Sequence, residues 1–331
     1  MISYLGSKQP AMKRRKFIGT TAMSLPLISM FPASLSAIVR ETIKGKIEKR
    51  ALGKTGEMLS MIGFGGIVVD KATPEQAASR VKEAIDWGVN YFDVAPTYGN
   101  AEEMLGPALE PYRKDVFLAC KTTERKKEGA RKELEQSLKH LRTDHFDLYQ
   151  LHAVTTLEDV DTIFGKGGAM EAFVEAREEG KVKYLGFSAH SVEAALALMA
   201  GYEFDTILFP FNFAAWYNGN FGPQVMEEAH KRGMGILALK AMAWRKWEEG
   251  EERNIDKTWY KPLTEKEQAR EGLRFTLSHP VTAAIPPGHE DLFSMALGLA
   301  TDFTPMSNNE IQAIKEKAMQ TDPIFSYPMH S

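Results

Sequence analysis

After about residue 60, short apolar runs alternate with amphipathic helical patterns along most of the chain. Each apolar run has the length of a strand, and the segments between them, such as 75–87 and 129–142, repeat their apolar positions at helical spacing. Glycines such as Gly88 close these helices before the next run. The runs that predict strands begin near Met61, Tyr91, Val116, Phe146, Val182, Phe204, Gly235 and Val281.

Continuously apolar strands that alternate with helices are typical of a parallel sheet covered on its outside, and eight such units close into a barrel. We therefore predict an α/β fold, a (β/α)8 TIM barrel over residues 45–331, with an N-terminal β-hairpin over 50–60 and an extra C-terminal helix over 307–320. A doubly wound sheet is the alternative. The segment Gly63-Phe64-Gly65-Gly66 disfavours it, because this segment lacks the third glycine and the following helix of a dinucleotide-binding turn.

The first 37 residues have the order of an export signal. The basic cluster Lys13-Arg14-Arg15-Lys16 precedes a mildly apolar run to Phe31, and the small residues 33–37 follow. The apolar run is short and interrupted by glycine and proline, whereas a membrane-spanning helix needs about 20 apolar residues. We expect cleavage near Ala37 and no stable membrane span afterwards.

The segment Arg14-Arg15-Lys16-Phe17-Ile18 resembles the twin-arginine export signal of bacteria. The resemblance implies the twin-arginine export machinery as a partner and a periplasmic location. Either Met1 or Met12 can be the true start, because Met12 already precedes a compact signal. The alternative is that the segment is only a basic, frayed N-terminal arm.

Composition narrows the possible partners and cofactors. Lys and Arg number 41 against 44 Asp and Glu, for a net charge of −3, and residues 1–37 hold five of the basic residues and no acid. The rest of the chain is therefore more acidic, which disfavours nucleic acid as a partner. Cys120 is the single cysteine, so an internal disulfide, an iron–sulfur cluster and a cysteine zinc site are excluded, and we expect no metal.

Three consecutive predicted strands end in a polar residue: Asp93, Lys121 and His152. Taken singly, each has an ordinary interpretation, namely a loop cap, a surface lysine and a hydrogen-bonded core histidine. In a parallel barrel, however, the active site lies at the C-terminal ends of the strands. Neighbouring strands would bring the three side chains to one rim, where a buried lysine and a buried aspartate need each other.

Longer motifs around these residues resemble those of the aldo-keto reductases. They are Phe92-Asp93-Val94-Ala95-Pro96-Thr97-Tyr98-Gly99-Asn100-Ala101-Glu102 with Leu105-Gly106, then Lys121, Leu148-Tyr149-Gln150-Leu151-His152, Gly180-Lys181-Val182-Lys183-Tyr184-Leu185-Gly186-Phe187-Ser188 and Phe211-Asn212. The resemblance covers residues 48–303. It implies an NAD(P)H-dependent oxidoreductase that reduces an aldehyde, ketone or sugar carbonyl, or oxidises the alcohol, with Asp93, Tyr98, Lys121 and His152 as the catalytic tetrad.

The chemistry of such a reduction suits these residue types. Tyr98 would donate the proton to the developing alkoxide, and a nearby ammonium, here Lys121, would lower its pKa from about 10. Asp93 would pair with Lys121, and the resemblance implies that His152 orients the carbonyl. A cofactor-binding sensor or regulatory barrel without significant turnover is the alternative, since fold does not decide function.

The resemblance also implies a cofactor site, though several of its positions differ from the family pattern. The implied contacts are Gly65, Ser188, Asn212, Lys240, Pro286 and Gly288. Ala189, Leu208 and Leu239 stand where asparagine, glutamine and an aromatic residue are usual. NADP(H) follows from the resemblance, but no Lys or Arg occurs from Phe275 to Ile314, so NAD(H) is an alternative unless another loop supplies the cation.

Three long loops, 153–168, 213–221 and 243–262, are expected to frame the substrate pocket. Their aromatic residues could form its apolar walls. The pocket residues we expect are Trp216, Tyr217 and Trp244. The substrate is then a small carbonyl compound or alcohol whose identity these residues do not specify.

Overall fold

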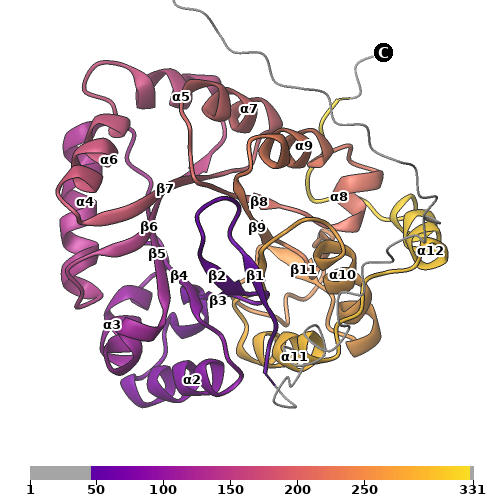
Figure 1. Cartoon of the computed structure of the whole chain (residues 1–331). Coiled ribbons are helices and arrows are strands. Elements are labelled where there is room, and N and C mark those ends of the chain that lie inside the picture. Colours follow the sequence, from indigo (N-terminus) through magenta and orange to yellow (C-terminus); the bar gives the residue numbers. More distant parts are fainter. Residues whose placement is uncertain (1–45, 329–331) are drawn as a thin grey trace, which may run out of the picture. The chain divides into compact units, whose positions relative to one another are not determined.

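Eight parallel strands lie side by side in one sheet in the computed structural model, which describes residues 46–328 (Figure 1). Their order is β3-β4-β5-β6-β7-β8-β9-β12. The sheet closes on itself through a parallel bridge between Ile62 and Ala284, with Gly63 N donating to Ala284 O at 3.0 Å. The predicted barrel is confirmed, whereas the expected signal and its cleavage site lie outside the described residues.

The barrel strands are β3 (Phe64–Gly65), β4 (Tyr91–Asp93), β5 (Phe117–Thr122), β6 (Phe146–Val154), β7 (Val182–Ala189), β8 (Thr206–Pro210), β9 (Gly235–Leu239) and β12 (Ala283–Ile285). Strands β4, β6, β7 and β9 begin where the sequence predicts, and the other four begin one to three residues later. The helices are α2 (Pro74–Asp86), α3 (Ala101–Leu109), α4 (Lys127–His140), α5 (Leu157–Phe164), α6 (Ala169–Glu178), α7 (Val192–Gly201), α8 (Phe213–Tyr217), α9 (Pro223–Lys231), α10 (Lys266–Leu277), α11 (Glu290–Thr301) and α12 (Asn308–Ala318), with short 3-10 turns η1 (Gly66–Val69) and η2 (Glu110–Asp115).

The helices surround the strands, and two of them, α2 and α12, begin with a capping box (Figure 1). In α2, the Thr73 hydroxyl accepts from Gln76 N and the Gln76 side chain accepts from Thr73 N, which makes a capping box ahead of Pro74. Its apolar face, which includes Val81, is buried against the sheet. The predicted C-terminal helix is α12, which begins with a second capping box between Ser307 and Glu310.

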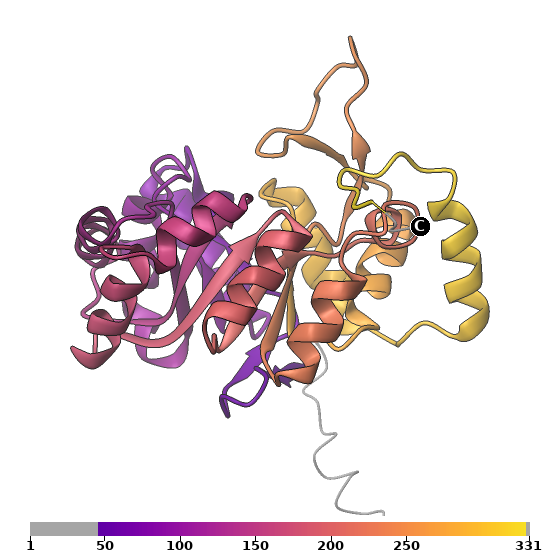
Figure 2. The same ribbon diagram turned by 90° about the horizontal axis from the view of Figure 1, so that it is seen from above.

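A short hairpin, β1 (Lys49–Ala51) and β2 (Met58–Ser60), lies at the N-terminal end of the barrel, as predicted (Figure 2). Its Leu52 and Leu59 are buried in the barrel interior with side chains from the strands. Gly53 has a φ of +52°, and a Cβ there would lie 2.4 Å from Gly235 N. The hairpin therefore closes this end of the barrel with apolar side chains and needs a glycine at its closest approach to β9.

The loops expected to frame the pocket contain more regular structure than the sequence predicts. Segment 153–168 holds α5, segment 213–221 holds α8, and segment 243–262 begins and ends in an antiparallel pair, β10 (Ala243–Lys246) and β11 (Tyr260–Pro262). The three segments are therefore not simple loops. Side-chain caps explain the two helices, since Thr156 accepts from Asp159 N and Asn212 accepts from Ala215 N. The β10–β11 excursion projects from the end of the barrel opposite the hairpin (Figure 2).

Candidate active site

Polar side chains replace apolar ones at the C-terminal ends of β4, β5 and β6, on the face that points into the barrel. Tyr91, Phe117, Ala119 and Leu148 belong to the buried interior cluster. Because strand side chains alternate between faces, Asp93, Lys121 and His152 lie an even number of residues further along and share that inward face. The convergence expected from the sequence is found.

Lys121 and Asp93 form a buried ion pair, with side-chain exposures of 0% and 2%. Gln150 Nε2 donates to Asp93 Oδ2 at 2.9 Å, and Tyr91 OH donates to the same oxygen at 3.1 Å. Burial acts to lower the pKa of Lys121, but the attraction and hydrogen bond of Asp93, together with Tyr98, outweigh it, so the net pKa is raised and the ammonium persists. The interpretation of Lys121 as a surface lysine is therefore wrong.

Gln150 and Tyr91 are polar residues of the site that the sequence analysis did not single out. Gln150 pairs with Lys121 in the register of β5 and β6, two residues before His152 on the same face. That spacing was the signal that could have identified it. Together the two residues supply donors to an oxygen of Asp93 that Lys121 does not use.

The Tyr98 hydroxyl lies beside this ion pair. Lys121 Nζ donates to Tyr98 OH at 3.5 Å and lies 5.1 Å from the centre of the tyrosine ring. Burial raises the pKa of Tyr98, and although Lys121 lowers it, the net pKa is raised. The lowering expected from the sequence is therefore present as a contribution and outweighed by burial and by the carboxylate of Asp93. Tyr98 holds its proton and can act as an acid.

His152, from β6, packs edge-on against the ring of Tyr98, with ring centres 5.8 Å apart. Burial lowers the pKa of His152 to about 2, with a further contribution from Lys121, so the imidazole is neutral. Ser188 Oγ accepts from Ala153 N at 2.8 Å and lies 3.3 Å from His152 Nδ1, which it can therefore supply with a proton. When the Ser188 hydroxyl donates to Nδ1, the proton of the neutral imidazole is on Nε2.

A cavity of about 240 Å³ opens in front of these side chains. It is lined by Gly65, Ile67, Asp93, Tyr98, His152, His190, Leu239, Lys240, Lys257, Thr258, Trp259, Tyr260, Ile285, Pro286, Pro287 and Gly288. Four residues expected to contact the cofactor, Gly65, Lys240, Pro286 and Gly288, are among them. Ser188 and Asn212 are not in this lining: Ser188 contacts His152, and Asn212 caps α8 and has a buried Nδ2 without a partner among the described residues.

The three aromatic residues expected in the pocket lie elsewhere. Trp216 packs on His279, with ring centres 4.6 Å apart, and Tyr217 packs on Phe275 at 5.6 Å, both on the outside of the barrel. Trp244 lies in β10 under the guanidinium of Arg245. Trp259 and Tyr260 supply the aromatic wall of the cavity instead. They lie where the β10–β11 excursion returns to the barrel, at the start of β11.

Two glycines at the phosphate-side turn pack closely against side chains of the protein itself. A Cβ at Gly288 would lie 2.4 Å from Ile67 Cγ2 and 3.2 Å from Lys257 Cβ, and a Cβ at Gly65 would lie 2.9 Å from Ile285 Cγ2. Lys257, which comes from the β10–β11 excursion, brings a cation to this turn. The sequence analysis allowed for such a cation from another loop. Lys240 and Lys257 line the cavity beside this turn, so the residues present fit the anionic diphosphate of the nicotinamide cofactor that the sequence implies.

Both cations near the turn are held by one carboxylate at the start of α11. Arg80 Nη2 donates to Glu290 Oε1 at 2.9 Å, and Lys257 Nζ lies 3.4 Å from Glu290 Oε2. Burial acts to raise the pKa of Glu290, but its hydrogen bonds and the two cations lower it overall, so it remains charged. Lys257 also donates to Val68 O at 3.0 Å.

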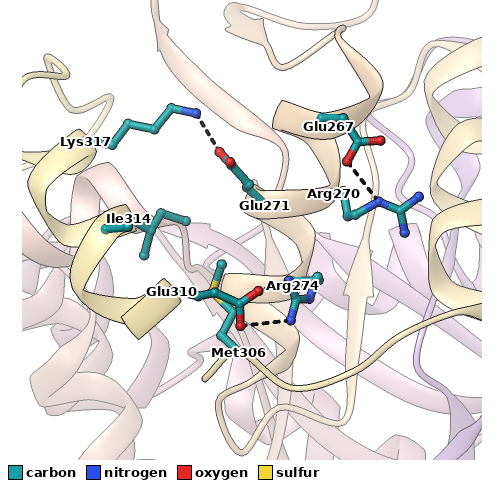
Figure 3. Close-up of a pocket in the computed structure, with 9 residues that line it drawn as sticks. Glu267, Arg270, Glu271, Arg274, Met306, Glu310, Ile314 and Lys317 are labelled. Carbon is teal, nitrogen blue, oxygen red and sulfur yellow. Dashed lines mark hydrogen bonds and ion pairs between the residues drawn. The ribbon is translucent and has the colours of Figure 1, made fainter. Parts of the chain in front are cut away.

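A larger hollow of about 430 Å³ lies between α10 and α12 (Figure 3). Its charged side chains are paired with one another: Lys317 with Glu271 at 2.6 Å, Arg274 with Glu310 at 2.7 Å, and Arg270 with Glu267 at 3.4 Å. It contains none of Asp93, Tyr98, Lys121 and His152. The smaller cavity at the barrel end is therefore the candidate active site, although it is not the largest.

Residues 46–328 offer neither a metal centre of clustered ligands nor a membrane-spanning helix. No cluster of three or more histidine, cysteine or acidic side chains in this part of the chain could hold a metal ion. Nor does any helix within these residues have the length and apolar character needed to cross a membrane.

Comparison with known proteins places the chain in a broad group of enzymes. The model of the Aldo/keto reductase family matches residues 61–286. The chain is 33% identical over 157 residues to "Uncharacterized oxidoreductase YqkF" of Bacillus subtilis and 35% identical over 159 residues to "L-galactose dehydrogenase" of Arabidopsis thaliana. Each match covers 43% of this chain and 49% of the relative, so the chain spans about half the length of these curated relatives.

The fold also matches solved structures. One is an aldo/keto reductase from Klebsiella pneumoniae in complex with NADP and acetate, with a TM-score of 0.65 and 20% identity. The match covers 85% of this chain and 98% of the other. At this identity the likeness concerns the fold alone.

Proposed function

The chain belongs to the aldo/keto reductase family, and we propose that it transfers a hydride between a nicotinamide cofactor and a small carbonyl compound. The observation that carries this proposal is the Tyr98 hydroxyl, which lies beside the Lys121 ammonium at a cavity that the neutral His152 also lines. In the reducing direction the carbonyl carbon receives the hydride and its oxygen receives the Tyr98 proton, which gives an alcohol. Solvent then returns a proton to the tyrosine.

Each residue has one task in this scheme. His152 Nε2–H donates to the carbonyl oxygen and polarises it, while Tyr98 supplies the proton. Lys121 stabilises the phenolate that remains, and Asp93 keeps Lys121 charged and in place. Ser188 holds the His152 ring in the tautomer that donates toward the cavity.

The cofactor would lie along Gly65, Leu239, Lys240, Pro286 and Gly288, which line the cavity. When bound, the nicotinamide supplies or accepts the hydride. Leu239 offers an apolar surface to the ring where the family commonly places an aromatic residue. The named Klebsiella structure holds NADP, which supports a nicotinamide cofactor at this site.

We further infer that NADH binds at least as well as NADPH. Glu290 already engages Arg80 and Lys257, and its charge would repel a 2′-phosphate placed next to α11. The same carboxylate can accept a hydrogen bond from a free ribose 2′-hydroxyl.

The decisive experiment follows reduced-nicotinamide absorbance with NADH or NADPH and a panel of aldehydes, ketones and sugars. Turnover of any of them supports the proposal. Tight binding of cofactor without turnover of any carbonyl or alcohol overturns it in favour of a sensor or regulatory barrel.

Export completes the proposal. The signal-like residues 1–37 and the pair Arg14-Arg15 support transport by the twin-arginine machinery, cleavage near Ala37 and a periplasmic location. The enzyme would then act on its small-molecule substrate outside the cytoplasm.

A further inference from the structure

The end of β6 that carries His152 is irregular. The pairing of β6 with β7 shifts register between Leu151 and Val154. His152 and Ala153 therefore both stand opposite Ser188, which makes a β-bulge. Ala153 has a φ of +50°, in the left-handed region that glycine adopts far more readily than alanine. A bulge can re-aim a side chain beside an active site, but an alanine keeps this conformation only where its surroundings hold it.

Arg125 holds this bulge from the loop between β5 and α4. Its Nη2 donates to His152 O at 2.9 Å and to Ala153 O at 3.4 Å. Its Nε lies 3.3 Å from Asp159 Oδ1 in the first turn of α5, and its own carbonyl accepts from Ala169 N at 3.0 Å. The Arg125 side chain is only 16% exposed, so these charge-assisted hydrogen bonds are largely shielded from water and fix both bulge carbonyls.

The direction of the Ala153 amide decides what the Ser188 hydroxyl can do. Ala153 N donates to Ser188 Oγ at 2.8 Å, and His152 Nδ1 lies 3.3 Å from the same oxygen. Ser188 is fully buried, and within residues 46–328 its hydroxyl has no third partner. Because its oxygen already accepts from the amide, the hydroxyl satisfies its own hydrogen by donating to Nδ1. The proton of the neutral imidazole is then on Nε2, the atom that donates in the proposed reaction.

We propose that Arg125 is a positioning residue for His152: by holding the two bulge carbonyls it keeps the Ala153 amide on Ser188 and so fixes the Nε2–H tautomer. Arg125 is not among the residues that line the cavity, so it acts through His152 rather than on the substrate. The effect on turnover rests on the proposed function, whereas the tautomer can be measured without substrate.

One nitrogen of Arg125 supplies the competing explanation. Its Nη1 is buried and has no hydrogen-bond partner among the described residues. Direct binding of an acidic substrate by this nitrogen would change KM, whereas a positioning role through His152 changes kcat. The two explanations therefore separate in steady-state kinetics.

The first test reads the tautomer directly by NMR, with the full-length enzyme labelled with 15N-histidine. The ring signals of His152 are those that disappear in His152→Gln. In the parent they should be those of a neutral imidazole protonated at Nε2, and in Arg125→Met a mixture of both tautomers should appear. A parent protonated at Nδ1, or an Arg125→Met variant with unchanged signals, overturns the inference whether or not the enzyme turns over.

The second test follows reduction of 4-nitrobenzaldehyde by NADH or NADPH. Arg125→Met should lower kcat roughly 10- to 100-fold with KM changed less than about threefold, since a catalytic group misplaced by about 1 Å can cost about 100-fold. Arg125→Lys should restore part of the loss, because it keeps the charge and a donor. In an Ala153→Gly background the same Arg125→Met change should cost only about a few-fold, since glycine adopts this φ without being held.

Two kinetic results decide against the inference or against the proposed function. If Arg125→Met instead raises KM for succinic semialdehyde about tenfold and leaves kcat unchanged, Nη1 binds the substrate and the inference is wrong. A parent that turns over no carbonyl rejects the proposed function, and the tautomer measured by NMR still decides the inference.

Arg113 provides the matched control at the other end of β6. Its side chain is 15% exposed, its Nη2 donates to His145 O at 2.9 Å, and its Nη1 lies 3.0 Å from Asp147 Oδ2. Arg113→Met should therefore lower the urea midpoint about as much as Arg125→Met while leaving kcat and the His152 tautomer unchanged. Equal losses of kcat in the two variants would show that Arg125 matters only for stability, and the inference would be wrong.

Discussion

At the scale of single residues, the site depends on how the cost of burying the charges of Lys121 and Asp93 is offset. A lysine and an aspartate removed from water lose hydration that their mutual attraction repays only when the remaining hydrogen-bonding positions are filled. Tyr91 and Gln150 fill positions on Asp93, and Val94 O accepts from Lys121 at 3.2 Å. The ammonium is therefore fixed beside Tyr98 rather than free to move.

Lys121→Met tests this pair. Loss of one partner of a buried ion pair typically destabilises a protein by about 3–5 kcal/mol, because the other charge stays buried and unpaired. Urea unfolding should show that loss, and the double variant Lys121→Met with Asp93→Asn should be less destabilised than the single variant. Equal stability of Lys121→Met and the parent would contradict the ion pair as described.

Tyr98→Phe tests the proton donor. The change removes one hydroxyl and keeps the ring on Lys121 and His152, so kcat should fall by about 10² to 10⁴, the usual worth of general acid catalysis. The dissociation constant for the nicotinamide cofactor should change little, as measured by fluorescence titration. Activity within a few-fold of the parent would assign proton transfer to another group.

The sequence could predict site residues whose position follows from the order of the strands. It did not predict site residues that reach the cavity through contacts between distant segments. Asp93, Lys121 and His152 end consecutive strands, so parallel pairing alone brings them together. Trp216 was misplaced because apolar character in a segment does not say whether it faces a pocket or a neighbouring helix. Trp259 reaches the cavity only because β10 and β11 pair and return the chain to it.

At the scale of elements, the first turn of α11 bears on the preference between NADH and NADPH, because its Glu290 engages two cations. The sequence suggested a missing cation, but the tertiary structure brings Arg80 from α2 and Lys257 from the β10–β11 excursion to the first turn of α11. Contacts between elements more than thirty residues apart are not visible in a local pattern. What the local sequence does contain is Glu290, which engages both cations.

Glu290→Gln tests the role of this carboxylate. Removing its charge frees Arg80 and Lys257 for a 2′-phosphate, so NADPH affinity should rise relative to NADH by about tenfold or more, since hydrogen bonds to charged groups contribute about 1.5–3 kcal/mol. Asp291→Asn, an exposed change in the same turn, is the control and should alter the ratio little. The parent should not favour NADPH a thousandfold; if it does, a different cation binds the phosphate.

At the scale of the whole molecule, the barrel needs a nicotinamide cofactor, whereas the proposed signal would send the protein to a compartment that does not evidently supply one. A twin-arginine route carries folded proteins, so the barrel would close around its cofactor before export. The periplasm has no evident pool of reduced nicotinamide. An exported enzyme of this kind must keep its cofactor and recycle it between two substrates, or draw electrons from an external partner.

Export and retention can be measured together. Arg14→Lys with Arg15→Lys keeps the charge of the segment but removes the arginine pair, so the protein should remain in the cytoplasmic fraction, whereas Lys13→Arg with Lys16→Arg should still be exported. Protein from the periplasmic fraction should carry nicotinamide after dialysis, detected by mass spectrometry of the released cofactor. Unchanged export of the first variant would indicate the general secretory route, and cofactor-free protein that binds nicotinamide weakly would contradict retention. Export and barrel chemistry are independent of each other. A failure of export therefore leaves the barrel chemistry untouched, and a failure of retention points to an external electron donor.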